Sequence, residues 1–584
     1  MFCEKIQIGK NKIIKKISPF FILRIDINLN IIILKNKLNP TIVMKSNILL
    51  KILISISLIF ISCINKPKEP IICDVLIYNG TVYDGSGEKP YVGSVAVKDD
   101  RIVYVGENTL FEADTTIDAS GLSISPGFIN MLSWGYGTLM QDGRALSDVK
   151  QGVTLEIFGE GTSPGPYWKD KKFTSFGEAM QALEENGVSV NIASFLGAAT
   201  TRILEVGYDN RPATEEEMEK MRNHVKNSME EGAMGIGSSL IYAPGDYAST
   251  EELIELCKVA SSYDGMYISH MRNEDNSVMS ALEELITISK EADIPAEIYH
   301  LKSSREANWD KLDKIIERVE QVRSEGLEIT ADIYTYNASS TGLTGVIPTW
   351  VQEGGHRAWI NRMKDPSVRP RLLADIRKQL SEQPPEGILM VGFKTSAMSK
   401  KYLAKTVAEA AEMRGQSPEE AIIDMVIEDD NRIQCIYFSM SEENIRKKIQ
   451  LPWVSFCSDA GSYSDISKKF RTHPRAFGSF IRVLGRYSRD EKLFPLEEGI
   501  RRLTHFPATT LKLKDRGMLK ENYFADVVIF DADKVDDRAT FEEPLQYAVG
   551  VNHVLVNGTP VLIDGNHTNN FSGRFVKGPG YKED

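Results

Sequence analysis

Short apolar runs with the composition of β-strands recur along the middle of the chain. We place eight of them, at 127–131, 152–158, 188–196, 233–239, 265–270, 294–300, 327–334 and 453–459. Most are separated by helical patterns, such as 214–227 and 249–260, the second opened by the capping-box pair Ser249 and Glu252. Eight alternating units predict an α/β fold, a (β/α)8 barrel rather than an open sheet.

The seventh and eighth predicted strands lie far apart in the sequence, so the barrel should carry an insertion. We expect it at about residues 343–450, before the last barrel strand, and largely helical, with helices at 368–382, 401–412 and 418–428. The barrel with its insertion would then occupy residues 126–514.

On both sides of this region, apolar and polar residues alternate in short runs that are separated by turn residues, a pattern typical of short β-strands. Asn79-Gly80 is a hairpin signal near the first end. Neither end has enough apolar strand to bury a core alone. We therefore expect residues 73–125 and 515–584 to form one small β-sandwich domain together.

The start of the chain differs from the rest. Residues 1–43 have no clear amphipathic period, and we interpret them as an upstream extension that ends just before a true start at Met44. Residues 44–63 then have the basic start and short apolar core of a secretory signal, ending at Cys63 in a motif that resembles a bacterial lipoprotein lipobox. An uncleaved anchor or a plain signal peptide is the alternative. Residues 64–72 are a polar tether, and the expected location is the bacterial cell envelope, periplasmic or lipid-anchored.

Composition narrows the class of protein. The net charge of −12 argues against nucleic acid as a partner and against an anionic membrane, apart from a lipid anchor at Cys63. The six cysteines include no CxxC pair, so the sequence indicates neither a zinc ribbon nor a disulfide framework. A soluble enzyme with a small-molecule substrate and no protein partner fits best.

Polar side chains gather where the predicted barrel strands end. His270 and His300 close the fifth and sixth strands, Glu160 follows the second and Asp459 ends the eighth. One carboxylate and two imidazoles are a good ligand set for a divalent metal ion, and a further carboxylate can move protons beside it. Ordinary alternatives are core or surface histidines, a solvated loop carboxylate at Glu160 and an N-cap at Asp459.

The chain resembles the N-acyl-D-amino-acid deacylases (D-aminoacylases) of the amidohydrolase superfamily, over about residues 74–574. The motifs that carry the resemblance are weak singly and strong in their order and spacing. They are Asn-Gly-Thr-Val-Tyr-Asp-Gly at 79–85, Pro-Gly-Phe-Ile at 126–129, Gln-Gly-Val-Thr at 151–154, His-Met-Arg-Asn-Glu at 270–274, His-Leu-Lys at 300–302, Ser-Asp at 458–459, His-Pro-Arg-Ala-Phe-Gly at 473–478, Arg-Gly at 516–517 and Ala-Asp at 525–526.

The resemblance implies a β-sandwich with a metal-containing barrel that hydrolyses the amide between an acyl group and a D-amino acid. It makes His270 and His300 metal ligands and Asp459 the general base and acid. Arg475 would pair with the substrate α-carboxylate, a task suited to its planar fork. Lys302 and one of Tyr334 or Tyr336 would share it, since both tyrosines follow Asp332 at period two.

Two departures from the family pattern bear on the metal. The usual His-x-His pair after Pro-Gly-Phe-Ile is replaced by Leu132 and Trp134, so a second metal site should be absent. The usual metal-binding cysteine is replaced by Glu160. We expect one divalent ion, zinc in the first instance, held by Glu160, His270 and His300. The alternatives are a hydrolase for another amide, such as a D-dipeptide or a cyclic amide, and a binding protein that has lost the chemistry.

Overall fold

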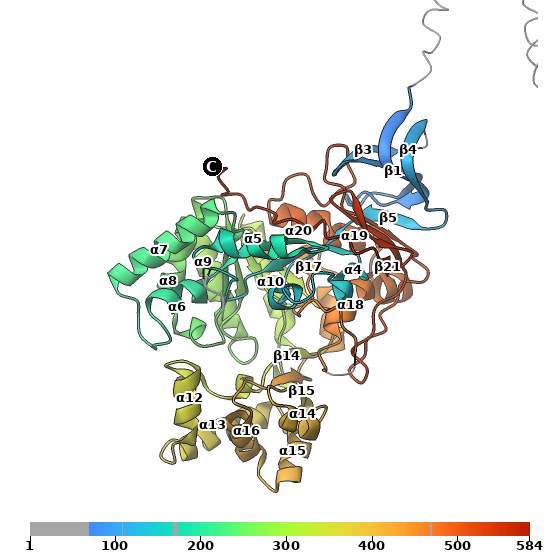
Figure 1. The fold of residues 1–584 in the computed structure, drawn as a ribbon. Coiled ribbons are helices and arrows are strands. Elements are labelled where there is room, and N and C mark those ends of the chain that lie inside the picture. The colour runs from blue at the N-terminus through green and yellow to red at the C-terminus, as the bar shows by residue number, and fades with distance from the viewer. Residues whose placement is uncertain (1–68, 108, 167–172, 468–469, 584) are drawn as a thin grey trace, which may run out of the picture. The chain divides into compact units, whose positions relative to one another are not determined.

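The computed structural model describes residues 69–107, 109–166, 173–467 and 470–583. The predicted upstream extension, the signal segment with Cys63 and most of the predicted tether lie outside these residues. The elements below belong to the unit Ile71–Asp584 (Figure 1). None of the helices within the described ranges combines the length and the hydropathy needed to cross a membrane.

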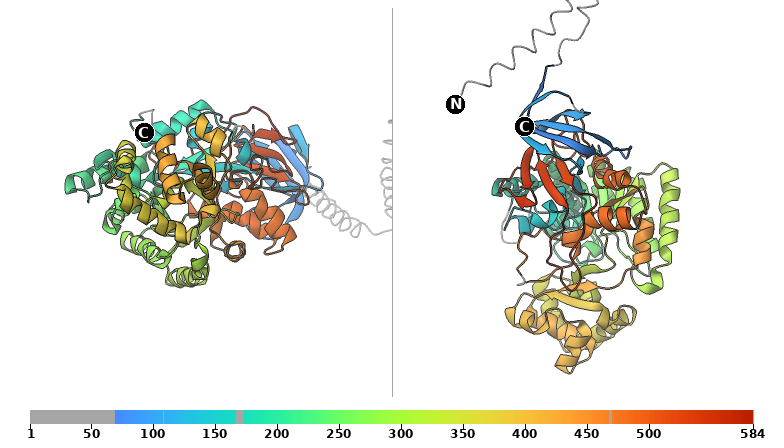
Figure 2. Two further views of the ribbon diagram at one scale, coloured as in Figure 1. Left: turned by 90° about the horizontal axis from the view of Figure 1, so that it is seen from below. Right: turned by 90° about the vertical axis from the view of Figure 1, so that its right-hand side faces the viewer.

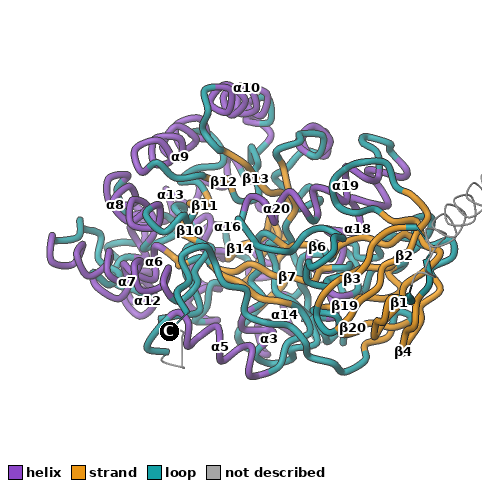
Figure 3. The backbone as a smooth tube through the Cα atoms, turned by 90° about the horizontal axis from the view of Figure 1, so that it is seen from above, coloured by secondary structure: helices purple, strands orange, loops and turns teal. Residues whose placement is uncertain are grey.

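A closed barrel of parallel strands is the centre of this unit, as predicted. In the described chain it has eight strand positions, one of which is shared by the consecutive strands β8 and β9. The strands are β6 (Phe128–Asn130), β7 (Val153–Phe158), β8 (Asn191–Ser194) with β9 (Leu196–Gly197), β10 (Gly235–Ser239), β11 (Met266–His270), β12 (Ala296–Ile298), β13 (Ile329–Ile333) and β17 (Val454–Phe456). The ring closes where Met131 N donates to Phe456 O at 3.2 Å. Figure 3 shows the strands from above, with helices outside them.

Amphipathic helices cover the barrel and bury their apolar faces on it. They are α3 (Tyr136–Leu139), α4 (Leu146–Val149), α5 (Phe176–Asn186), α6 (Ala198–Glu205), α7 (Glu215–Glu230), α8 (Thr250–Ser261), α9 (Val278–Ala292), α10 (Lys311–Ser324), α17 (Glu442–Lys448), α18 (Arg475–Arg482), which runs into a π-helical segment (Val483–Asp490), α19 (Leu496–Leu503) and α20 (His505–Thr510). Ser249 caps α8 as predicted, but Glu252 does not complete a capping box. Its carboxylate instead pairs with the buried Arg202 at 2.6 Å.

Strands from both ends of the unit form one sheet. Its nine members in the described residues are β1 (Ile71–Val82), β2 (Tyr91–Lys98), β3 (Arg101–Gly106), β4 (Phe111–Asp118) and β5 (Ser123–Pro126) from the first end, and β18 (Val527–Phe530), β19 (Val551–Val556), β20 (Thr559–Ile563) and β21 (Asn566–His567) from the second. The two sets join where β5 pairs antiparallel with β18. Both halves of the sheet bury side chains in a common core, so the sheet folds over on itself.

The hairpin expected at Asn79-Gly80 is absent from the described sheet. Both residues lie inside β1, where the pairing with β2 shifts register between Ile77 and Gly80. Asn79 has a φ of 62°, so the pair that favours a tight turn here makes a β-bulge within a continuous strand.

Residues 339–437, between β13 and α17, form a separate small layer of structure. It has a core of its own and consists of β14 (Ser339–Gly342), α11 (Thr349–Gln352), α12 (His356–Lys364), α13 (Arg369–Glu382), β15 (Ile388–Gly392), α14 (Ser396–Tyr402), α15 (Val407–Arg414), α16 (Pro418–Asp429) and β16 (Gln434–Tyr437). Its helices are seen in yellow and orange in Figure 2. The described residues also include an antiparallel sheet, β14-β16-β15, that the sequence did not indicate.

A buried polar network connects the terminal sheet to the barrel. Asn191, at the start of β8, donates to both carboxylate oxygens of Asp526 at 3.3 and 3.2 Å. Asp526 also accepts the backbone N–H of Asn557 at 2.8 Å and pairs with Arg516. Each polar group depends on the others because all four side chains are buried.

We predict that Asp526→Ala destabilises the protein by about 3–5 kcal/mol, because it leaves the Arg516 guanidinium buried without its anion. Urea unfolding of residues 64–584 measures the change. Glu216→Ala removes an exposed carboxylate from an i,i+4 pair with Lys220 and should leave the midpoint unchanged. Equal midpoints for the wild type and Asp526→Ala would contradict the prediction.

Candidate active site

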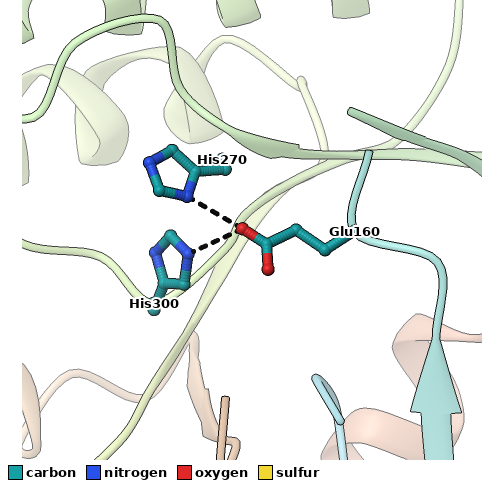
Figure 4. A group of neighbouring side chains, drawn as sticks. All are labelled: Glu160, His270 and His300. Carbon is teal, nitrogen blue, oxygen red and sulfur yellow. Dashed lines mark hydrogen bonds and ion pairs between the residues drawn. The ribbon is translucent and has the colours of Figure 1, made fainter. Parts of the chain in front are cut away.

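Three side chains predicted as metal ligands meet at one end of the barrel. Oε1 of Glu160 lies 2.8 Å from Nδ1 of His270 and 3.2 Å from Nε2 of His300 (Figure 4). The two imidazole rings are 4.5 Å apart between centroids and nearly perpendicular. All three side chains are buried. In the described residues they form the one group of histidine, cysteine and acidic side chains that converges closely enough to hold a metal ion.

Local backbone conformations bring these side chains together. Gly159, directly after β7, has a φ of 109°, and a Cβ on it would lie 2.3 Å from the carbonyl oxygen of Phe195. Only glycine fits this turn, which aims Glu160 into the barrel mouth. His270 ends β11, while His300 stands two residues beyond β12 with a φ of 35°, its N–H held by Asp332 Oδ1 at 2.7 Å.

Charge and burial compete at the ligands. Burial opposes ionisation of Glu160, but hydrogen bonds from His270 and His300 outweigh it and lower the pKa of the carboxyl group. Burial and the Lys302 cation disfavour protonation of His300, yet nearby carboxylates, Glu274 first, raise its pKa to about 9. A metal ion that binds at neutral pH must therefore displace a proton from His300.

Glu274 is a site residue that the sequence analysis did not single out. Its Oε1 lies 2.8 Å from Nζ of Lys302 and 3.2 Å from Nδ1 of His300, the ring nitrogen that faces away from Glu160. Burial opposes its ionisation, but His270, Lys302 and His300 hold its pKa well below the usual range. A carboxylate beyond a ligand histidine fixes the ring and its tautomer. The sequence offered one signal for this role, namely that Glu274 is an acidic residue four positions after the candidate ligand His270.

Lys302 therefore has partners other than a substrate carboxylate. Besides Glu274, its Nζ lies 2.6 Å from Nδ1 of His300. The buried ammonium lines the same cavity, but the Glu274 carboxylate already accepts from one of its three donors.

Asp459 and Arg475 face each other across the same cavity. Nη1 of Arg475 lies 2.6 Å from Oδ2 of Asp459, and both side chains are almost fully buried. Arg475 is the first residue of α18, and its backbone N–H donates to Nδ1 of His473 at 3.0 Å. Nε of Arg475 has no hydrogen-bond acceptor among the described residues, and the partner of Nη1 is Asp459. A buried guanidinium with a free donor is prepared to receive an anion.

Tyr334 lies in the cavity through its ring rather than its hydroxyl. Its O–H is directed to Sδ of Met440 at 3.3 Å, while the Arg475 guanidinium stacks over its ring at 4.5 Å. Tyr334 thus supports the arginine from one face.

Tyr336 lies outside the cavity, contrary to its predicted part in substrate binding. Its hydroxyl donates to Oδ2 of Asp537 at 3.0 Å, and Arg482 covers its ring. The period-two argument failed because β13 ends at Ile333, so the two tyrosines do not follow an extended strand.

The cavity around these groups has a volume of about 700 Å³. Its floor consists of barrel residues, including the three candidate ligands, Asp459, Arg475 and Trp134. Its opposite wall comes from the insertion, with Thr341, Val346, Gln379 and Arg432 among its residues. A space of this size admits a small organic molecule with its polar groups toward the floor.

The donor set fits a divalent metal ion. Tetrahedral zinc with bonds of about 2.0–2.1 Å separates its ligand atoms by roughly 3.4 Å. The 2.8 and 3.2 Å separations from Glu160 Oε1 need only a small expansion. The buried carboxylate is anionic, and the outer nitrogen of His300 already has a carboxylate partner.

Known proteins place this architecture in a family. The amidohydrolase family model matches residues 115–562, and the chain belongs to the amidohydrolase family. More particularly, it is 30% identical over 521 residues to a D-aminoacylase from Alcaligenes xylosoxydans xylosoxydans, with 86% of this chain and 97% of that protein covered. It is also 30% identical over 505 residues to an N-acyl-D-glutamate deacylase from the same organism, with coverage of 84% and 93%.

Solved structures agree. One is a D-aminoacylase whose binuclear metal centre shows one-metal activation and second-metal attenuation. It superimposes with a TM-score of 0.74 at 29% identity, and the match covers 86% of this chain and all of that chain. An N-acyl-D-glutamate deacylase from Bordetella bronchiseptica, complexed with zinc and a phosphonate mimic of the tetrahedral intermediate, gives 0.73 at 28% identity, covering 87% and 100%. Active-site metal binding and amide hydrolysis are therefore properties of this chain's close structural relatives.

We predict that Glu160→Gln lowers metal affinity by more than the 10- to 100-fold typical of changes beyond the ligands, because the substitution removes the one anionic donor. Glu274→Gln keeps the ligand set and should stay within that 10- to 100-fold range. Elemental analysis and competition with a chelator measure both. Glu283→Gln, at an exposed carboxylate on α9 that pairs with Arg318, is the matched control and should bind like the wild type. Wild-type affinity in Glu160→Gln would contradict this ligand assignment.

Proposed function

We propose that this protein hydrolyses N-acyl-D-amino acids to a carboxylate and a free D-amino acid with one bound divalent metal ion. The observation that carries the proposal is the convergence of the Glu160, His270 and His300 group, the Asp459 carboxylate and the Arg475 guanidinium on a single cavity. The first supplies a metal site, the second a proton carrier and the third an anion site, which together match an amide substrate that bears a carboxylate.

Arg475 would orient the substrate. Its Nε donor is buried and has no acceptor, so a substrate carboxylate that reaches the guanidinium leaves water and gains charge-assisted hydrogen bonds in a site of low polarity. Tyr334 stacks on the guanidinium and keeps its plane in one orientation. With the α-carboxylate fixed there, the amide bond lies between Arg475 and the candidate ligands.

Asp459 would carry the proton. Its carboxylate accepts a proton as water attacks the amide carbonyl carbon, and returns that proton to the nitrogen as the C–N bond breaks, so the products are a carboxylate and an amine. A divalent ion at Glu160, His270 and His300 would polarise the carbonyl and activate water. Because Arg475 contacts Asp459, binding of the substrate carboxylate and positioning of the base are coupled in one ion pair.

One zinc ion is the metal content we propose. Leu132 is buried in the core beneath the site, and Trp134 has no lone pair for a metal, so neither can be a ligand. Zinc accepts carboxylate and imidazole together, and the relative from Bordetella bronchiseptica was obtained with zinc. The D-aminoacylase described by one-metal activation supports sufficiency of a single ion.

A location in the bacterial cell envelope also remains a proposal, based on the lipobox-like sequence that ends at Cys63. Metabolic labelling with a fatty acid, compared between the wild type and Cys63→Ser, tests it.

We predict D-selective amine release from a panel of N-acetyl-D- and N-acetyl-L-amino acids, with protein lacking residues 1–63. Asp459→Asn should lower kcat by about 10²- to 10⁴-fold because it removes the proton carrier. Arg475→Met should raise KM by on the order of 10- to 100-fold or more through loss of the carboxylate partner. It should also lower kcat, because it removes the guanidinium that contacts Asp459.

Arg318→Met, at a partly exposed arginine on α10, is the matched control for Arg475→Met and should keep wild-type kinetics. Bound metal without turnover of any panel member would refute the N-acyl-D-amino-acid assignment and favour another amide, such as a D-dipeptide or a cyclic amide. A folded protein with neither metal nor turnover would favour a binding protein.

A further inference from the structure

We propose that Trp134 is a positioning residue for Asp459, whose carboxylate it orients for proton transfer through its indole N–H. The inference rests on the proposed function, because it acts through the role of Asp459 as proton carrier. It is independent of the substrate's acyl group and side chain.

The backbone first brings the two residues into register. Asp459 N donates to Leu132 O at 2.9 Å, and Trp134 N donates to Ala460 O at 2.9 Å. Between these bonds, Ser133 and Ala460 form a parallel β-bridge. The segment after β6 therefore pairs directly with the segment after β17, and this pairing sets Trp134 beside Asp459 although the two are far apart in sequence.

The side chains then complete the contact. Nε1 of Trp134 donates to Oδ1 of Asp459 at 3.2 Å, while Arg475 lies against Oδ2. The indole N–H on one oxygen and the guanidinium beside the other fix the plane of the carboxylate as well as its position. The indole is neutral, so it adds direction without placing a second cation beside the base. Asp459 also has a φ of 47°, a conformation that needs support from its surroundings.

The exposure of Trp134 argues against a role in packing alone. Its side chain is 45% exposed, an unusual state for an indole, and the exposed part lines the cavity. A phenylalanine or leucine would form the same apolar wall. What tryptophan alone among the apolar side chains adds is the N–H, and that N–H meets Asp459.

Trp134→Phe tests this because it keeps the aromatic wall and removes the donor. We expect kcat to fall by roughly 10- to 100-fold, the effect of losing a hydrogen bond to a charged group, with KM within about twofold of the wild type and the metal content unchanged. Added to Asp459→Asn, the substitution should cause no further loss of the residual rate, because its effect passes through Asp459.

Trp350→Phe is the matched control. Trp350 makes an indole–carboxylate hydrogen bond of 3.0 Å to Asp375 in the insertion and is not part of the cavity wall. It should retain the wild-type kcat. A loss in Trp350→Phe equal to that in Trp134→Phe, a rise in KM alone, or wild-type kcat in Trp134→Phe would each overturn the proposal.

A readout without substrate separates this inference from the proposed function. In protein with ¹⁵N-labelled indoles, the resonance missing from Trp134→Phe should shift in Asp459→Ala, and the one missing from Trp350→Phe should not. If no N-acyl-D-amino acid is hydrolysed while the Trp134 resonance shifts, the proposed function fails and the contact between the indole and the carboxylate stands. An unshifted Trp134 resonance overturns the inference whatever the substrate.

Discussion

The charge of Glu160 is the constraint on which the rest of the site depends. A carboxylate removed from water is costly unless donors or cations surround it, and here both neighbours are imidazoles at hydrogen-bonding distance. Those imidazoles need partners in turn: Glu274 lies beside Nδ1 of His300, and Lys302 pairs with Glu274. The charges thus alternate outward from the centre, so that removal of any one leaves its neighbours uncompensated in a buried place.

The barrel could be predicted from the sequence because its strands are short runs made up mostly of apolar residues. The helices between them also show a clear helical periodicity of apolar positions. The ligand histidines could be predicted because the carboxyl ends of parallel strands meet on one face of a barrel. Glu160 followed from the same reasoning. These inferences use only local pattern and one rule of topology.

Other features depended on tertiary contacts that no local pattern contains. The Asn79-Gly80 sequence is typical of a tight turn, yet pairing with β2 keeps both residues inside a strand. Glu252 stands where a capping box needs it, but the buried Arg202 competes for its carboxylate. Tyr336 was misplaced because the period-two argument assumed an extended chain as far as residue 336, whereas β13 ends at Ile333. The sheet of the insertion was missed because its strands are brief and lie between stronger helical signals.

The division of the cavity between barrel and insertion has a consequence for how such a protein diversifies. Every group that we assign to metal binding or proton transfer belongs to the barrel floor, whereas the opposite wall is one continuous stretch of chain with its own core. That stretch can accumulate substitutions, or be exchanged whole, without disturbing the chemistry beneath it. Selection for new substrates would therefore act on the insertion, whose own core supplies much of its stability. Selection for the catalytic rate would act on the barrel floor.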